Sequence, residues 1–104
     1  MKSERKERLE RAGFKVGTAG QFLGLSAEES AFVSVRLSLA KEVRRRRIDL
    51  HYSQVELARR LGSSQSRIAK LEAAEPDVSL DLLVRALLAT GAKVPEIGKA
   101  LTAA

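Results

Sequence analysis

The most regular pattern in the chain is a stripe of apolar residues at helical spacing within residues 32–43. The stripe consists of Phe32, Val35, Leu39 and Val43, with Leu37 and Ala40 beside it. Ser26 and Glu29 precede the stripe at the spacing of a capping box, in which the side chain of each residue bonds to the backbone N–H of the other. The pattern therefore predicts one long amphipathic helix from Ser26 to about Arg47.

Two shorter helices are predicted next, over residues 54–61 and 65–72. The apolar residues of the first are Leu57, Ala58 and Leu61, and those of the second are Ile68 and Leu71. Ser53 and Glu56 are spaced as a second capping box. Gly62 suits the left-handed backbone that commonly ends a helix, and either of the two serines after it can cap the next helix.

This spacing is typical of a helix-turn-helix, in which two helices cross steeply after a short turn. Ala58 is small enough to permit the close approach, Gly62 permits the turn, and Ile68 anchors the second helix in the core. The residues left facing outward on the second helix are Gln65, Ser66, Arg67, Ala69 and Lys70. Such a polar and basic face suits a helix that enters the major groove of DNA. The alternative is a helical hairpin that only packs.

The remaining apolar residues predict a fourth and a fifth helix. The fourth begins after Ser79 and ends before Gly91, and Pro95 suits the first turn of the fifth. Their apolar residues are Leu80, Leu82, Leu83, Val84, Leu87 and Leu88 in the fourth helix and Ile97, Ala100 and Leu101 in the fifth. We therefore predict an all-α domain of five helices in residues 26–104, preceded by an N-terminal extension of residues 1–25.

The extension is charged at its start and punctuated by glycines afterwards. Residues 1–11 contain one large apolar residue beyond Met1 and cannot bury a face, so they are frayed or ordered by a partner. We expect a DNA-bound or unbound state for residues 1–11, and a packing or toxin-binding role for Phe14–Leu25. The glycines do not predict a phosphate-binding loop, because no Gly-Lys-Ser/Thr follows them.

The net charge and the low aromatic content indicate which class of molecule the protein binds. The net charge of +6 and the pI of about 10.2 favour a polyanion, although they also suit simple solubility. Aromatic residues make up only 4% of the chain, which disfavours stacking platforms for single-stranded nucleic acid. The absence of cysteine agrees with a cytoplasmic location, and no apolar run reaches membrane-spanning length. Double-stranded DNA is therefore the expected polyanion.

Nothing in the sequence indicates an active site. His51 is the only histidine and cysteine is absent, so a metal site is not expected. No nucleophile stands with a base, and the neighbouring acids Glu28 and Glu29 point apart on a helix. We therefore expect neither enzymatic activity nor a cofactor.

The segment Gln54–Glu72 resembles the helix-turn-helix of the Xre family of bacterial and phage repressors. A wider resemblance, through Phe22–Glu29, the long helix and Val78–Gly91, is to the HigA-type antitoxins within that family. It implies an Xre/lambda-repressor-like domain that forms a homodimer, binds a palindromic operator, represses its own operon and neutralises a RelE-like ribonuclease toxin. The chain departs from the family at His51-Tyr52, because many members have a hydrophobic residue or Trp near the start of the motif helix.

The predicted site residues fall into three groups. The residues expected to read bases are Gln65, Ser66, Arg67 and Lys70, on the outward side of the second motif helix. Those expected to contact phosphates are Gln54, Ser64, Arg46 and Arg47, at helix N-termini or in the run of four arginines that ends the long helix. Those expected at a homodimer interface are Leu82, Leu88, Ile97 and Leu101, whose alternative role is to complete the monomer core.

Two functions of different classes follow from these observations. The first is a sequence-specific transcriptional regulator that binds DNA, as an antitoxin repressing its own operon or as an Xre repressor without a toxin partner. The second is a protein inhibitor whose main task is to hold a RelE-like toxin. The two are compatible, and the reading frame next to this gene would distinguish them.

Overall fold

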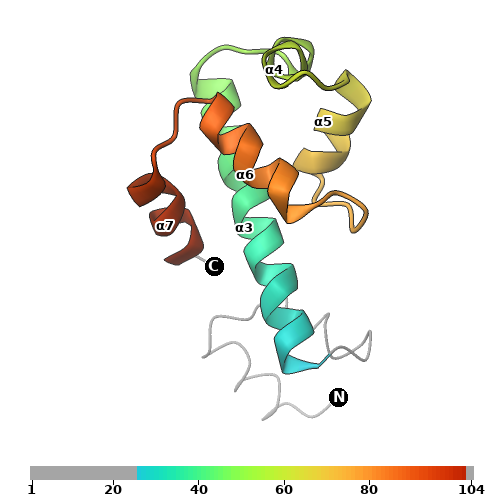
Figure 1. Ribbon diagram of the computed structural model, residues 1–104, viewed down its shortest axis with the longest axis vertical. Coiled ribbons are helices and arrows are strands. Elements are labelled where there is room, and N and C mark those ends of the chain that lie inside the picture. The colour runs from blue at the N-terminus through green and yellow to red at the C-terminus, as the bar shows by residue number, and fades with distance from the viewer. Residues whose placement is uncertain (1–25, 103–104) are drawn as a thin grey trace. The chain divides into compact units, whose positions relative to one another are not determined.

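The computed structural model describes residues 26–102, which form five α-helices and contain no strand (Figure 1). The helices are α3 (Ala27–Asp49), α4 (Gln54–Leu61), α5 (Gln65–Glu72), α6 (Leu80–Ala89) and α7 (Val94–Thr102). The all-α fold of five helices is thereby confirmed. The predictions for the extension of residues 1–25 lie outside the described residues.

The core belongs to the compact unit that begins at Arg36, within α3. Its largest fully buried side chains are Leu39 and Val43 of α3, Leu57 of α4, Ile68 and Leu71 of α5, and Leu83 and Leu87 of α6. The apolar stripe of α3 is therefore buried only in part. Phe32, at its start, is 49% exposed and precedes this unit, whereas the charged Arg36 is buried.

Serine side chains cap four of the helices. At the start of α3 the capping box is complete, because Ser26 N–H donates to Glu29 and Glu29 N–H donates to the Ser26 hydroxyl. At the start of α4 only half of the predicted box forms. Ser53 accepts from the N–H of Glu56, but the Glu56 carboxylate binds arginines of the next turn instead. The hydroxyls of Ser64 and Ser79 accept in the same way at the starts of α5 and α6.

Four helices end in a residue with left-handed backbone. These residues are His51 (φ 61°), Gly62 (φ 69°), Ala74 (φ 54°) and Gly91 (φ 87°). The N–H of the residue after each of them bonds to the carbonyl five positions earlier, which is the Schellman pattern. The two glycine ends were predicted from the sequence. The other two were not, because histidine and alanine seldom adopt this conformation.

Two arginines of α3 bind the backbone just after the helix ends at His51 and Ala74. Arg47 donates to the carbonyl of Tyr52, which follows His51, at 2.8 Å. Arg36 donates to the carbonyl of Glu75, which follows Ala74, at 2.5 Å. The α4–α5 hairpin is thus tied to α3 at Tyr52, shortly before α4 begins, and at Glu75, shortly after α5 ends.

Candidate DNA-binding interface

The outward face of α5 is the first part of the candidate interface. Its exposed residues are Gln65, Ser66, Arg67 and Lys70, the four that the sequence predicts to read bases. Ile68 and Leu71 of the same helix are fully buried in the core. The first turn of α5 contains no acidic residue. The arrangement presents a polar and basic helix face to solvent, and base contact by these residues stays a prediction.

A chain of hydrogen bonds joins α3 to the first residue of α5. The Glu72 carboxylate, only 5% exposed, accepts from Arg47 Nε at 2.5 Å and from Arg47 Nη2 at 3.1 Å. It also accepts from the Gln54 amide at 3.2 Å, and the Gln54 carbonyl oxygen accepts from Gln65 Nε2 at 2.7 Å. These hydrogen bonds run from Arg47 through Glu72 and Gln54 to Gln65, and each side chain orients the one that follows it. Gln65, the last of them, is exposed.

The Gln65 side chain keeps the groups that an adenine edge requires. A glutamine amide has two N–H donors and one carbonyl acceptor. One N–H is used by Gln54, which leaves the other N–H and the oxygen to meet adenine N7 and N6. The bond to Gln54 also restricts the amide, so a contact made by Gln65 would cost less side-chain freedom.

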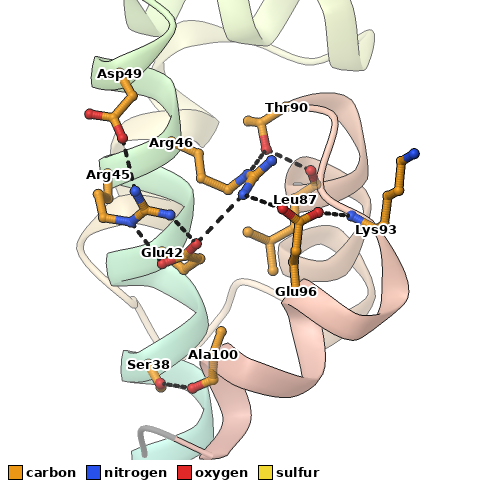
Figure 2. Close-up of polar contacts among 10 residues, drawn as sticks. All are labelled: Ser38, Glu42, Arg45, Arg46, Asp49, Leu87, Thr90, Lys93, Glu96 and Ala100. Carbon is orange, nitrogen blue, oxygen red and sulfur yellow. Dashed lines mark hydrogen bonds and ion pairs between the residues drawn. The ribbon is translucent and has the colours of Figure 1, made fainter.

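Arg46, predicted to contact phosphate, joins α3 to the C-terminal part of the fold (Figure 2). Its guanidinium donates to the Thr90 hydroxyl at 3.0 Å and lies 3.6 Å from Glu96 and 3.8 Å from Glu42. The backbone N–H of Lys93 and, to a smaller extent, Arg46 lower the pKa of Glu96 below its usual value. Arg46 is 18% exposed and serves internal contacts.

The other three arginines of the run also have intramolecular partners. Arg47 is 13% exposed and is bound to Glu72. Arg45 bonds to Glu42 and Asp49, and its hydrogen bond is the main reason that the pKa of Glu42 is lowered. Arg44 is the most exposed, at 64%, and approaches Glu72 to 4.0 Å. Phosphate contact by Arg46 and Arg47 stays a prediction, and Arg44 is the arginine of this run that is most accessible to a ligand.

Ser64 lies at the edge of a shallow hollow beside the outward face of α5. The hollow has a volume of about 180 Å³ and is lined by Ser64, Ser66, Arg67, Lys70, Asp77 and Val78. Lys70 Nζ lies 3.7 Å from Asp77 in this hollow. Sequence reasoning missed Asp77, because no helical spacing connects the loop after α5 with the face of α5.

The predicted dimer residues do not share one environment. Leu82 is only 9% exposed and belongs to the core, which leaves little of it for a partner. Leu88 of α6 and Leu101 of α7 are exposed, and Ile97 is half-buried. Val94, which was not singled out, is the most exposed large apolar residue in the part of the chain that the structure describes. A contact between two copies through these residues stays a prediction.

Neither a membrane span nor a metal site is visible in residues 26–102. No helix there is both long and apolar enough to cross a membrane. The same residues contain no group of three or more metal-binding side chains.

Comparison with known proteins identifies the family. A family model described as Helix-turn-helix matches residues 43–97, from the last turns of α3 to the first turn of α7. Searches among curated proteins and among solved structures found no match. The matched segment covers more than half of the chain and includes both motif helices. The chain therefore belongs to the Xre-like helix-turn-helix family of DNA-binding transcription regulators.

Proposed function

We propose that the protein represses transcription by placing α5 in the major groove of its own upstream DNA. Gln65, Ser66, Arg67 and Lys70 face the bases in this arrangement, with Gln65 at the N-terminal end of the helix, which reaches deepest. The observation that carries the proposal is the hydrogen-bond chain from Arg47 through Glu72 and Gln54 to Gln65. These hydrogen bonds hold the exposed Gln65 amide in a fixed orientation. Gln65 is not part of the hydrophobic core.

Phosphate contacts flank this reading face. Gln54 begins α4 and Ser64 caps α5, so both stand beside backbone N–H groups that favour anions. Among the four arginines that end α3, Arg44 has the exposure that a phosphate contact needs. Arg47 and Gln54 both donate to the Glu72 carboxylate. Arg46 also belongs to this proposal, although it already contacts Thr90 and Glu96 at the junction with α7.

Replacing Gln65 by Ala tests the reading role. Loss of a bidentate contact to adenine should weaken binding to the native upstream DNA by about 1–3 kcal/mol relative to binding to random DNA. Fluorescence anisotropy with the two duplexes at one salt concentration measures this difference. Thr102→Ala, an exposed change at the end of α7, is the control and should alter neither affinity. Equal weakening on both duplexes by Gln65→Ala would show that Gln65 does not read bases.

The proposed active form is a two-fold homodimer that binds a palindromic operator. Its interface consists of Leu88, Ile97 and Leu101, with Val94 as a further contact, because α6 and α7 leave these apolar side chains exposed or half-buried. A two-fold axis would set the two copies of α5 about 34 Å apart, one turn of duplex. Light scattering at micromolar protein concentration should give the mass of two chains, and the mass of one chain would contradict this form.

The finer biological role that we propose is that of an antitoxin that represses its own operon. The resemblance to HigA-type antitoxins in Phe22–Glu29 and Val78–Gly91 supports this role. An adjacent reading frame for a small basic RelE-like protein, neutralised when this chain is co-expressed, is the expected result. An Xre repressor that acts without a toxin would have no such neighbour.

A further inference from the structure

Helix α7 leaves its large apolar residues largely uncovered. Val94, Ile97 and Leu101 share one side of the helix, because residues three and four positions apart lie on the same face. Val94 is 76% exposed, Leu101 is 41% exposed and Ile97 is half-buried. Of the residues in α7, only the small Ala100 is buried. The part of the chain that the structure describes therefore does not cover this apolar stripe.

Contacts with α3 fix the orientation of α7 (Figure 2). The Ser38 hydroxyl donates to the carbonyl of Ala100 at 2.5 Å, and Glu96 lies 3.6 Å from Arg46. Glu96 and Ala100 are four residues apart and therefore lie on the same side of α7. Because this side faces α3, the apolar stripe is turned largely away from it.

Gly98 lies within the stripe, four residues after Val94 and three before Leu101. Glycine in the middle of a helix is less stable than alanine, because it loses more conformational freedom on folding. No contact within residues 26–102 explains the glycine. Gly98 is exposed, its φ is not positive, and a Cβ atom placed on it would meet nothing within 4 Å. The missing side chain therefore leaves the helix backbone accessible in the middle of the apolar stripe.

We propose that Gly98 is the point at which α7 of one copy crosses α7 of a second copy. The inference rests on the proposed function, in which α6 and α7 form a homodimer interface. At a two-fold axis the same residue of both helices meets at the crossing, and a small residue there lets the two backbones approach closely. The side chains of Val94 and Leu101, on either side of Gly98, are then covered by the partner's helix.

The charge at the start of α7 favours an antiparallel crossing with a second copy. Lys93 is exposed and directly precedes α7, where its charge lies at the positive end of its own helix dipole. Lys93 is five residues before Gly98, and α7 ends at Thr102, four residues after it. An antiparallel crossing at Gly98 therefore sets Lys93 beside the C-terminal end of the partner's α7, where a cation is favourable. The helix is thus complementary to a second copy of itself in charge as well as in shape.

The first test is Gly98→Ala, compared with Lys99→Ala. Both residues are exposed, but Lys99 lies on another side of α7. Analytical ultracentrifugation gives the Kd of the dimer. Gly98→Ala should raise this Kd by about tenfold or more, because two added methyl groups overpack the crossing. Lys99→Ala should leave it nearly unchanged. Thermal melting at a dilution that gives monomers should show no loss of stability in Gly98→Ala, because alanine favours a helix more than glycine does.

A single cysteine gives a second measurement, because the chain has no cysteine of its own. A disulfide forms only where two Cα atoms come within about 7 Å of each other. Gly98→Cys should therefore yield a cross-linked dimer under mild oxidation, much faster than Lys99→Cys. Equal cross-linking of the two cysteine variants, or a Gly98→Ala dimer as tight as the wild type, would overturn the inference and leave the proposed homodimer standing. A wild-type protein that is monomeric at micromolar concentration would overturn both.

Discussion

Glu72→Gln is expected to lower the free energy of unfolding by about 3–5 kcal/mol, the usual cost of removing one partner from a buried ion pair. The Glu72 carboxylate is almost completely buried and accepts from two nitrogens of Arg47 and from Gln54. A glutamine has the same size but one acceptor oxygen and no charge. The Arg47 guanidinium, itself mostly buried, would be left without its counter-charge. Urea denaturation followed by circular dichroism measures the loss.

The substitution should also weaken DNA binding at temperatures where the variant is still folded. Glu72 orients Gln54, and Gln54 in turn orients Gln65. Glu96→Gln is the matched control, because Glu96 forms a more exposed pair with Arg46 and has no link to α5. It should leave the denaturation midpoint nearly unchanged. A Glu72→Gln variant as stable as the Glu96→Gln variant would show that the pair with Arg47 is not what holds α3 to α5.

Ile68→Ala is expected to cost about 2–5 kcal/mol, because it opens a cavity in a close-packed core. Ile68 is completely buried, whereas Gln65 and Lys70 of the same helix are exposed. Of the eight residues in α5, Ile68 and Leu71 are the only two that are fully buried. A helix of this length has little stability of its own and depends on such tertiary contacts. Thermal unfolding of the purified domain measures the cost.

The comparison variant for Ile68→Ala is Val55→Ala on α4. Val55 is also β-branched, but most of its side chain is exposed. Its removal should change stability by no more than about 0.5 kcal/mol, as is usual for surface positions. If Ile68→Ala cost no more than Val55→Ala, the anchoring of the recognition helix would have to come from elsewhere.

The helix boundaries could be predicted because their signals are local. The hydroxyls of Ser53, Ser64 and Ser79 lie within three residues of the N–H groups that they cap. Gly62 and Gly91 likewise mark their helix ends by residue type alone. The ends at His51 and Ala74 carry no such mark. Their conformation depends on surrounding contacts, which the order of residues does not reveal.

The outward face of α5 could be predicted from the sequence, but the residues that contact this face from other parts of the fold could not. The exposure of Lys70 follows from the spacing of Ile68 and Leu71, because Lys70 lies on the other side of the helix. Gln65 is exposed as the first residue of the helix. The pairing of Arg46 with Glu42 could have been read from their separation of four residues. Glu72 lies 25 residues from Arg47, and Asp77 enters the hollow from a loop. Only the folded chain brings these residues together.

The two α3 arginines beside the motif limit how far the motif can be moved to another protein. Arg47 uses Nε, Nη1 and Nη2 to reach both Glu72 and the Tyr52 carbonyl, a geometry that lysine does not offer. Arg36 holds the Glu75 carbonyl at the other end of the hairpin. Residues 54–72 therefore include the outward face of α5, but they lack the two arginines that hold the chain on either side of the hairpin. A graft that transfers DNA specificity to a new scaffold would have to bring the α3 segment from residue 36 onward as well.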